Sequence, residues 1–408
     1  MIYFDNAATT CVGGAVLFEM LPYFSEVYGN PESVHQAADK PAKAIMEAEE
    51  RVHNMLHTNG SGKVVFTSGG TESNNMVFQL CKAYRPFAMN IITSATEHKS
   101  VLEPADSCKN AVIHLIKPGK KGFISADDLD MMCVPDFSVI SFMHMNNETG
   151  MVNEVYRIGE KLRKCSDLDI FYHVDCVQSA GELPIDVLEM NADMVSLSSH
   201  KLHGPKGVGC LWVSDRLLNR VDPQTMTLIY GGGQQSGLRA GTMNVTGIVG
   251  LGKACYLAGD GTVAREVIGA VSKHFVESLT RFCKDASIKF KVNFCKSDHH
   301  DDKVLSITFP EADSETVVMV ASKNGLCISN GAACNSVSSE PSYVLLNSGI
   351  KPDLARNTVR VSFSRYNTYT EAEHGAEILC EAVKEVLSLT GISSSDIMRS
   401  DEIERQTP

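Results

Sequence analysis

Two stretches carry the pattern that decides the fold, Phe171-Tyr-His-Val-Asp-Cys-Val-Gln178 and Met194-Val-Ser-Leu-Ser-Ser-His-Lys201. Each begins with apolar residues that favour a β-strand and ends in polar residues. Similar apolar runs occur at 64–66, 91–93, 139–143 and 208–213, and stretches with helical spacing lie between the runs at 41–56, 75–83 and 155–164. This alternation of strands and helices predicts a mostly parallel sheet with helices on both faces.

The chain changes its pattern after Gly259-Asp-Gly261. A long helical pattern follows from 263 to about 283, strand patterns lie at 304–309 and 359–364, and further helical patterns lie at 314–322 and 371–389. This arrangement predicts a second, smaller α/β domain. Beyond it, residues 393–408 are polar and are expected to form a flexible tail.

The composition excludes some classes of function. The 408 residues carry a formal net charge of −12, which argues against a nucleic-acid-binding surface. No uncharged apolar run approaches the ~18 residues of a membrane helix. The start, Met1-Ile-Tyr-Phe-Asp5, has the features of neither a signal peptide nor a mitochondrial leader. We therefore expect a cytoplasmic protein that binds neither nucleic acid nor membrane.

The 13 cysteines are scattered without a CxxC pair, so most are expected to be buried, reduced thiols. Cys334 differs, because its neighbours at 329–336 are small and polar and predict an exposed loop. Cys210 and Cys327 lie in apolar strand patterns and are expected to be structural. The run Ser297-Asp-His-His-Asp-Asp302 holds metal-ligating residue types but no helical spacing, which favours a solvated loop over a metal site.

Three segments hold side chains that suit one cofactor. The segment Lys63-Val-Val-Phe-Thr-Ser-Gly-Gly-Thr71 leads from a strand through a glycine turn into a helix start, where free N–H groups can bind a phosphate. Asp175 follows a strand and is either a partner for a protonated ring nitrogen or a helix N-cap. Lys201 is either a Schiff-base nucleophile or a surface lysine. Together the three match the needs of pyridoxal phosphate (PLP).

More specific motifs run in order along residues 3–385. They are Asp5-Asn-Ala-Ala-Thr-Thr10, Gly29-Asn-Pro31, Thr67-Ser-Gly-Gly-Thr-Glu-Ser-Asn-Asn75, Glu97-His-Lys99, Met145-Asn-Asn-Glu-Thr-Gly150, His173-Val-Asp175, Ser199-His-Lys-Leu-His-Gly-Pro-Lys-Gly207, Gly231-Gly-Gly233, Asn330-Gly-Ala-Ala-Cys334 and Glu340-Pro-Ser-Tyr-Val-Leu345. This series resembles the cysteine desulfurases of the NifS/IscS branch, which are class-V aminotransferases. The resemblance implies PLP fold type I: a large domain (14–258) with a mostly parallel seven-stranded sheet flanked by helices, and a smaller α/β domain (1–13 and 259–392).

The resemblance also implies roles for the matching residues. Lys201 would bind PLP covalently, Asp175 would keep the ring nitrogen protonated, and His98 would stack on the ring and transfer protons. Cys334 would accept the substrate's sulfur. The other residues expected at the site are Gly70, Thr71, Ser198 and His200 at the phosphate, Asn147 and Gln178 near the phenolic oxygen, Thr242 from a second subunit, and Arg360 and Asn147 at the substrate.

The implied reaction is a sulfur transfer from L-cysteine that gives L-alanine and a persulfide on Cys334. The implied partners are a second copy of the chain and a sulfur acceptor, such as an iron–sulfur scaffold or a tRNA-thiolation enzyme, and Cys334 is a candidate for a transient iron–sulfur ligand. Selenocysteine lyase and a non-catalytic scaffold stay open as alternatives, whereas an aminotransferase or racemase would leave Cys334 unexplained. Gln235-Ser236 and Ser199 depart from the residues usual in the family.

Overall fold

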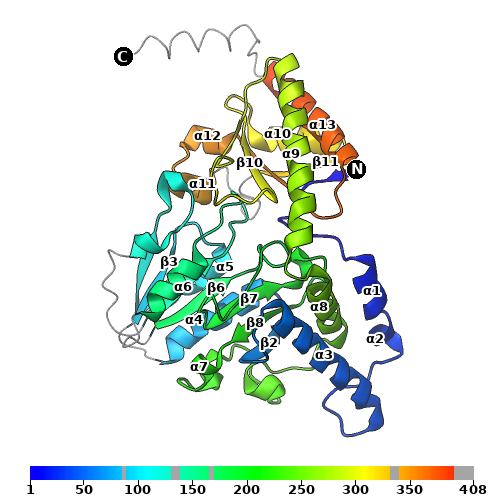
Figure 1. The fold of residues 1–408 in the computed structure, drawn as a ribbon, viewed down its shortest axis with the longest axis vertical. Coiled ribbons are helices and arrows are strands. Elements are labelled where there is room, and N and C mark those ends of the chain that lie inside the picture. The colour runs from blue at the N-terminus through cyan, green and yellow to red at the C-terminus, as the bar shows by residue number, and fades with distance from the viewer. Residues whose placement is uncertain (85–88, 130–137, 165–169, 331–339, 390–408) are drawn as a thin grey trace.

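The largest element of the fold is a seven-stranded sheet (Figure 1). This computed structural model describes residues 1–84, 89–129, 138–164, 170–330 and 340–389. The strands lie in the order β2 (Lys63–Thr67), β8 (Gly209–Val213), β7 (Met194–Ser198), β6 (Ile170–Asp175), β5 (Ser138–Met143), β3 (Met89–Ser94) and β4 (Ala111–Ile116). Only β8 runs against its neighbours, β2 and β7. The predicted mostly parallel, seven-stranded sheet is therefore confirmed.

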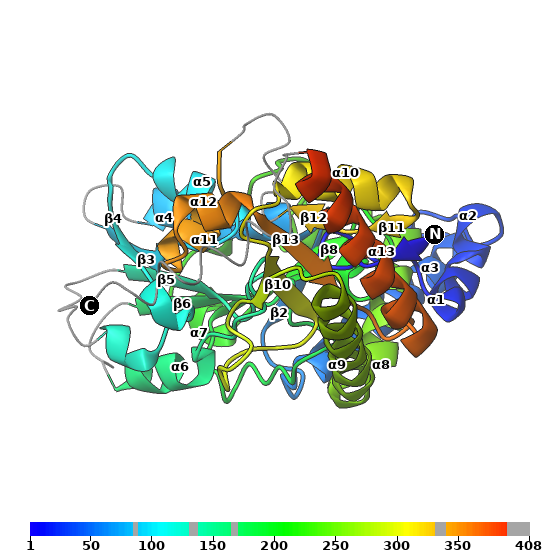
Figure 2. The same ribbon diagram turned by 90° about the horizontal axis from the view of Figure 1, so that it is seen from above.

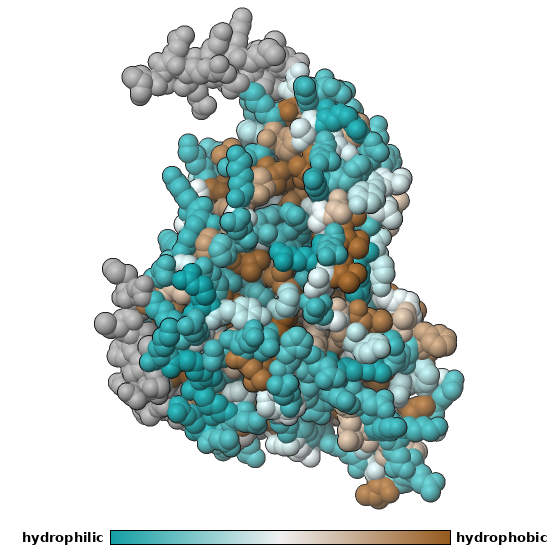
Figure 3. Space-filling model, in the orientation of Figure 1, coloured by the Kyte–Doolittle hydropathy of each residue, from teal (hydrophilic) through white to brown (hydrophobic). Residues whose placement is uncertain are grey.

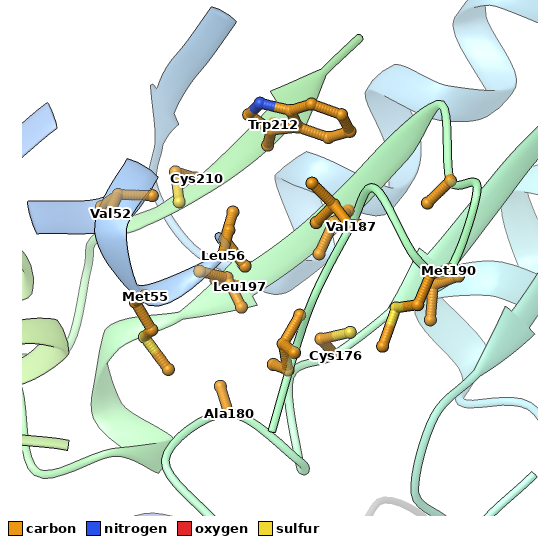
Figure 4. Packing of buried hydrophobic residues seen from close by; sticks show 14 of the residues in the cluster. Val52, Met55, Leu56, Cys176, Ala180, Val187, Met190, Leu197, Cys210 and Trp212 are labelled. Carbon is orange, nitrogen blue, oxygen red and sulfur yellow. The ribbon is translucent and has the colours of Figure 1, made fainter. Parts of the chain in front are cut away.

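Helices cover both faces of this sheet. The helices of this part of the chain are α1 (Gly14–Met20), α2 (Pro22–Ser25), α3 (Asp39–Met55), α4 (Gly70–Tyr84), α5 (Lys99–Asp106), α6 (Val155–Arg163), α7 (Asp215–Leu218) and α8 (Val245–Ala258), of which α2 packs on α1 and α8 and not on the sheet. Val64 and Phe66 of β2 share a core with residues of α3, α6 and α8, whereas Val65 shares a core with α4 and α5, as the alternation of side chains along a strand requires. Figure 4 shows the first core, where Leu56, which follows α3, lies beside Leu197 of β7.

A second body lies above this sheet in Figure 1 and contains both the first residues and the C-terminal third of the described chain. Its strands are β12 (Ser329–Asn330), β13 (Thr358–Ser362), β10 (Val304–Thr308) and β9 (Lys291–Val292) in one antiparallel sheet, and β1 (Ile2–Tyr3) beside β11 (Leu326–Cys327) in another. Its helices are α9 (Thr262–Asp285), α10 (Ser314–Lys323), α11 (Tyr343–Asn347), α12 (Pro352–Arg356) and α13 (Tyr369–Leu389). We call the two bodies the large domain and the small domain. The domain boundaries given from the sequence stay a prediction.

The N-terminal residues are built into the core of the small domain. The ring of Phe4 lies 4.8 Å from that of Phe363 and 5.7 Å from that of Phe275. All three side chains are buried, and α9 and α13 pack along this core (Figure 2). The residues that follow Phe4 are consequently held at the junction of the two domains.

The secondary structure agrees with the sequence patterns at every predicted strand and helix among the described residues, with small shifts at the ends. One loop differs. In the run 297–302, which was expected to be solvated, Asp301 is buried and accepts a hydrogen bond from Arg265 Nε at 2.9 Å, and His299 stacks on Phe123. The run is therefore only partly solvated, because Asp298 and Asp302 are exposed as expected whereas Asp301 is not. The described residues contain no His, Cys, Asp and Glu cluster fit for a metal ion and no helix with the length and apolarity to cross a membrane.

One edge of the large sheet is occupied by a side chain. Gln235 accepts a hydrogen bond from the backbone N–H of Phe66 at 2.7 Å and donates one to the carbonyl of the same residue at 2.9 Å. Its amide thus pairs with β2 as a neighbouring strand would. Both Gln235 and Ser236 have left-handed backbone conformations, with φ of 53° and 60°, which the tight turn after Gly233 imposes. Gln235 and Ser236, the two residues that depart from the family here, therefore lie beside the edge of β2.

Candidate active site

A pocket lies between the large sheet and the small domain. It is lined by Ala7, Ala8, Gly70, Thr71, Asn74, His98, Ser100, Met143, Met145, Asn147, Asp175, Val177, Gln178, Ser198, His200, Lys201 and Arg360. Most of the predicted site residues are in this group, although they come from segments far apart in the chain. Thr242 is exposed and does not line the pocket, and Cys334 lies outside the described residues.

One wall of the pocket, which we call the strand-end wall, consists of Asp175, Ser198 and Lys201. Asp175 and Ser198 are the last residues of the adjacent strands β6 and β7, and Lys201 follows in a single 3₁₀ turn, Ser199–Lys201. Because β6 and β7 are parallel, their polar ends meet at the same edge of the sheet. The short apolar strands thus place an acid and an amine in one pocket.

The turn before α4 forms the end of the pocket. Gly69 has a φ of +151°, and a Cβ atom on Gly70 would lie 2.7 Å from Cγ2 of Val177, so larger residues do not fit here. The turn thereby brings the first N–H groups of the 15-residue helix α4 and the Thr71 hydroxyl to the pocket beside Ser198. Burial, together with the charges of Lys201 and Lys206, lowers the pKa of His200 to about 4. The helix start with these neutral donors suits a phosphate.

The opposite wall, which we call the N-terminal wall, consists of residues 5–10. Its backbone carbonyls face the strand-end wall: Lys201 Nζ donates to Ala7 O at 2.5 Å and to Ala8 O at 2.8 Å, and Gln178 Nε2 donates to Ala7 O at 2.9 Å. On its other side, Ala7 N donates to Ser362 Oγ of β13 at 2.9 Å. The wall is therefore held by hydrogen bonds to both domains.

Arg360 enters the pocket from β13 and is almost completely buried. Its Nη2 donates to Oδ1 of Asp5 at 2.7 Å, and its Nη1 donates to the carbonyl of Asn147 at 3.1 Å. Nε is buried and has no hydrogen-bond partner among the described residues. A buried guanidinium with an unsatisfied N–H is suited to bind a carboxylate that enters the pocket.

Burial controls the protonation of the acids and bases at the site. Burial, followed by the nearby Asp175 charge, raises the pKa of Glu97 well above its ordinary value, although Ser94 Oγ (2.6 Å) and Met143 N (2.8 Å) donate to its carboxyl. Burial also lowers the pKa of His98, with Asp175 acting in the opposite direction and Lys201 in the same. Burial thus favours the protonated form of Glu97 and the neutral form of His98.

Several site features could not be read from the sequence. Ala7, Ala8 and Asn74 lie within the quoted motifs but received no role, because the alanines contribute only backbone carbonyls and Asn74, like Ser100, is a small polar residue on a helix. Ser199 also departs from the family. Its side chain is completely buried, and a Cβ atom on Gly204 would lie 1.9 Å from its Oγ, so glycine at 204 makes room for this hydroxyl.

Comparison with known proteins identifies the family. Residues 2–374 match the family described as aminotransferase class-V. The chain belongs to this family. It is 33% identical to the cysteine desulfurase IscS of Clostridium botulinum strain Hall, with 94% of each chain covered. It is also 33% identical to the human cysteine desulfurase, with 95% of this chain and 83% of the human protein covered. The resemblance predicted from the motifs is therefore confirmed.

Solved structures agree with this family. A NifS-like protein has a TM-score of 0.82 and 29% identity, and the alignment covers 94% of this chain and 99% of that one. A structure titled SspA in complex with cysteine has a TM-score of 0.73 and 32% identity, with 90% of this chain and 100% of that one covered. The shared architecture is PLP fold type I, as predicted.

Class-V aminotransferases use PLP, and the pocket fits it. Asp175 accepts one N–H bond on each oxygen, from Val177 N at 2.9 Å and from Asn74 Nδ2 at 2.8 Å, which orients the carboxylate. Oε1 of the pocket residue Gln178 is buried without a hydrogen-bond partner among the described residues and suits a ligand donor. With the phosphate-type donors at Gly70–Thr71 and the amine of Lys201, these groups match the ring, phenolic and phosphate ends of the cofactor.

Proposed function

We propose that this protein is a cysteine desulfurase, which transfers sulfur from L-cysteine to one of its own cysteines. The observation that carries the proposal is the convergence of Lys201, Asp175, His98 and Arg360 on one pocket. The first three match the needs of PLP, and Arg360 provides a carboxylate site from the opposite domain. Two relatives and one similar structure named above, with cysteine desulfurase or cysteine in their names, support the same assignment.

Each of the pocket residues has a separate role in the proposed reaction. When bound, PLP withdraws electrons from the Cα atom of an amino acid substrate. Lys201 would hold the cofactor and, once the substrate amine has replaced it, would take the proton from Cα. Arg360 would hold the carboxylate with two parallel hydrogen bonds and so fix which bond faces Lys201. Asp175 would stabilise the positive ring nitrogen from within the sheet.

Cys334 is the proposed sulfur acceptor. Its thiolate would attack the substrate Sγ and form an S–S bond while the Cβ–Sγ bond breaks. The electron pair of the broken bond stays on the carbon fragment, which takes up a proton and leaves as alanine. The enzyme then carries a persulfide for an acceptor protein, such as an iron–sulfur scaffold or a tRNA-thiolation enzyme. We propose in addition that Cys334 transiently ligates an iron–sulfur cluster. The proposed location of the protein is the cytoplasm.

A homodimer completes the proposal. Apolar side chains that follow one another along α1 and α2 are exposed, including Phe18 (77%) and Phe24 (64%). Figure 3 shows apolar residues among hydrophilic ones over this part of the molecule. Exposed patches of this kind are typical of protein interfaces.

Thr242, which is exposed on its own chain, would reach the phosphate site of the other subunit. Sedimentation of the wild type and of Phe18→Asp tests this part, because a dimer predicts dissociation of the variant.

The decisive experiment measures alanine and sulfide released from L-cysteine in the presence of dithiothreitol. We expect activity in the wild type and none in Cys334→Ser, with the same cofactor absorption in both proteins. Cys295→Ser is the matched control, because Cys295 is an exposed cysteine that does not line the pocket. Full activity of Cys334→Ser would contradict the proposal. Much faster turnover of L-selenocysteine would instead favour a selenocysteine lyase.

A further inference from the structure

A chain of hydrogen bonds connects His98 to Asp175 along the wall of the pocket. Nδ1 of His98 lies 2.8 Å from Oγ of Ser100. Asn74 Nδ2 donates to this Oγ at 2.8 Å and also to Oδ2 of Asp175 at 2.8 Å. Asn74 and Ser100 are buried on α4 and α5, so water does not compete for these bonds. The resemblance to the family gives the ring nitrogen to Asp175 and proton transfer to His98, and these two groups are therefore coupled.

The direction of each bond follows from the carboxylate. An ionised Asp175 accepts hydrogen bonds only, so it fixes the Asn74 side chain with its nitrogen toward Oδ2. The second hydrogen of that nitrogen is donated to Ser100. Because the Ser100 oxygen already accepts this bond, its own proton is directed to the next acceptor, which is Nδ1 of His98.

The start of α5 adds a second donor to the same atom. His98 is the N-cap of this helix, and Ser100 N donates to Nδ1 at 3.1 Å. Nδ1 thus accepts from both the hydroxyl and the backbone N–H of Ser100. An imidazole nitrogen that accepts two hydrogen bonds carries no proton, so neutral His98 has its proton on Nε2.

We propose that Asn74 and Ser100 are positioning residues that set the tautomer of His98 according to the charge of Asp175. The inference deepens the proposed function, because it makes Nε2 the atom at which His98 donates a proton. The charged groups near His98 are Asp175, Lys201 and Lys99, and the buried Glu97 precedes it in the chain. If Asp175 lost its charge, the side-chain amide of Asn74 would be free to rotate. The Ser100 hydroxyl would then no longer be directed to Nδ1 of His98.

The test reads the tautomer directly. Nitrogen-15 NMR of histidine-labelled, cofactor-loaded full-length protein distinguishes the two ring nitrogens, and His98→Gln assigns the signals. We expect the Nε2–H form in the wild type. In Ser100→Ala the ratio of the Nε2–H form to the Nδ1–H form should fall about fivefold, the value of one hydrogen bond. Ser100→Thr keeps the hydroxyl and should restore the wild-type ratio.

Two further variants keep the test decisive. Asn74→Ala removes the group that directs the Ser100 proton and should lower the ratio in the same sense. Ser107→Ala removes a hydroxyl at the other end of α5, which donates to Pro104 O, and should change nothing. A wild-type His98 with its proton on Nδ1, or an unchanged ratio in both Ser100→Ala and Asn74→Ala, would overturn the inference. Because the readout is not turnover, a lack of desulfurase activity would refute the proposed function and leave this result intact.

Discussion

The two walls of the pocket are built in different ways. The strand-end wall takes Asp175, Ser198 and Lys201 from two adjacent parallel strands, so the register of the sheet sets their spacing. The N-terminal wall takes its position from hydrogen bonds to side chains of both domains, among them Gln178 and Ser362. The first wall is fixed by local structure and supplies chemistry through side chains. The second depends on the docking of the small domain and presents backbone carbonyls.

This difference assigns the chemistry to one region and the selection of substrate to another. Arg360 belongs to the side of the N-terminal wall, since it pairs with Asp5, whereas the amine of Lys201 belongs to the strand-end wall. A change in the strand-end wall should therefore act mainly on the rate constant. A change in the N-terminal wall should act mainly on substrate binding or on stability.

The largest effect is expected for Lys201→Ala. This variant removes both the covalent anchor and the base from the strand-end wall, so turnover of L-cysteine should fall by about 10⁴-fold. Steady-state assays and the loss of the absorption band of the lysine-bound cofactor check this result. Lys206→Ala, at an exposed lysine in the next turn, is the control. Activity within tenfold of the wild type would show that another amine does this work.

Arg360→Lys should have the next largest effect. A lysine keeps the positive charge but cannot form two parallel bonds to a carboxylate, so kcat/KM for L-cysteine should fall roughly 10- to 100-fold, mainly through KM. Arg356→Lys, at an exposed position just before β13, should behave as the wild type. A fall in kcat alone would place Arg360 in the chemistry and remove the distinction between the walls.

The stability of the protein should depend on pH through His173, which lies in β6, the strand that ends in Asp175 of the strand-end wall. His173 is fully buried in β6 between Ser141 Oγ (2.8 Å) and Ser196 Oγ (2.9 Å), and burial lowers its pKa to about 3. Below about pH 6.5 the unfolded chain takes up a proton at this histidine while the folded one does not. The free energy of unfolding therefore decreases as the pH is lowered. The loss from this residue between pH 7 and 5 is about 2 kcal/mol.

Chemical denaturation at the two pH values tests this dependence. The wild type should lose about 2 kcal/mol more than His173→Asn, in which an amide takes the place of the ring between the two serines. An equal loss in both proteins would mean that the remaining buried histidines, such as His144 with a pKa of about 4, carry the pH dependence.

The smallest effect is expected for Ser362→Ala. The variant leaves the buried N–H of Ala7 without its acceptor and should lower the free energy of unfolding by about 1 kcal/mol. KM should rise slightly with kcat unchanged, because only the N-terminal wall is loosened. Ser388→Ala, at an exposed site near the end of α13, is the control in the same denaturation experiment. A fall in kcat as large as that of Lys201→Ala would show that the walls are not separable.

The same contrast explains what the sequence could predict. Asp175 and Lys201 follow strands with clear apolar patterns, so local reasoning found both the strands and the polar ends. Ala7 and Ala8 belong to a quoted motif, but their role could not be predicted, because a backbone carbonyl has the same chemistry in every residue. The helix α8 was also missed, since it is buried on nearly all sides and contains several glycines, which removes the amphipathic pattern. Thr242, which needs a second subunit, and Cys334 stay predictions.

The amide of Gln235 at the edge of β2 has a consequence for the behaviour of the protein at high concentration. An unpaired edge strand can add a strand from another molecule and so start aggregation. Here the N–H and C=O of Phe66 are already satisfied within the same chain. Gln235 therefore denies an incoming strand these two bonds and favours solubility. Gln235→Ala would reopen this edge, and light scattering on warming would show earlier self-association than in the wild type.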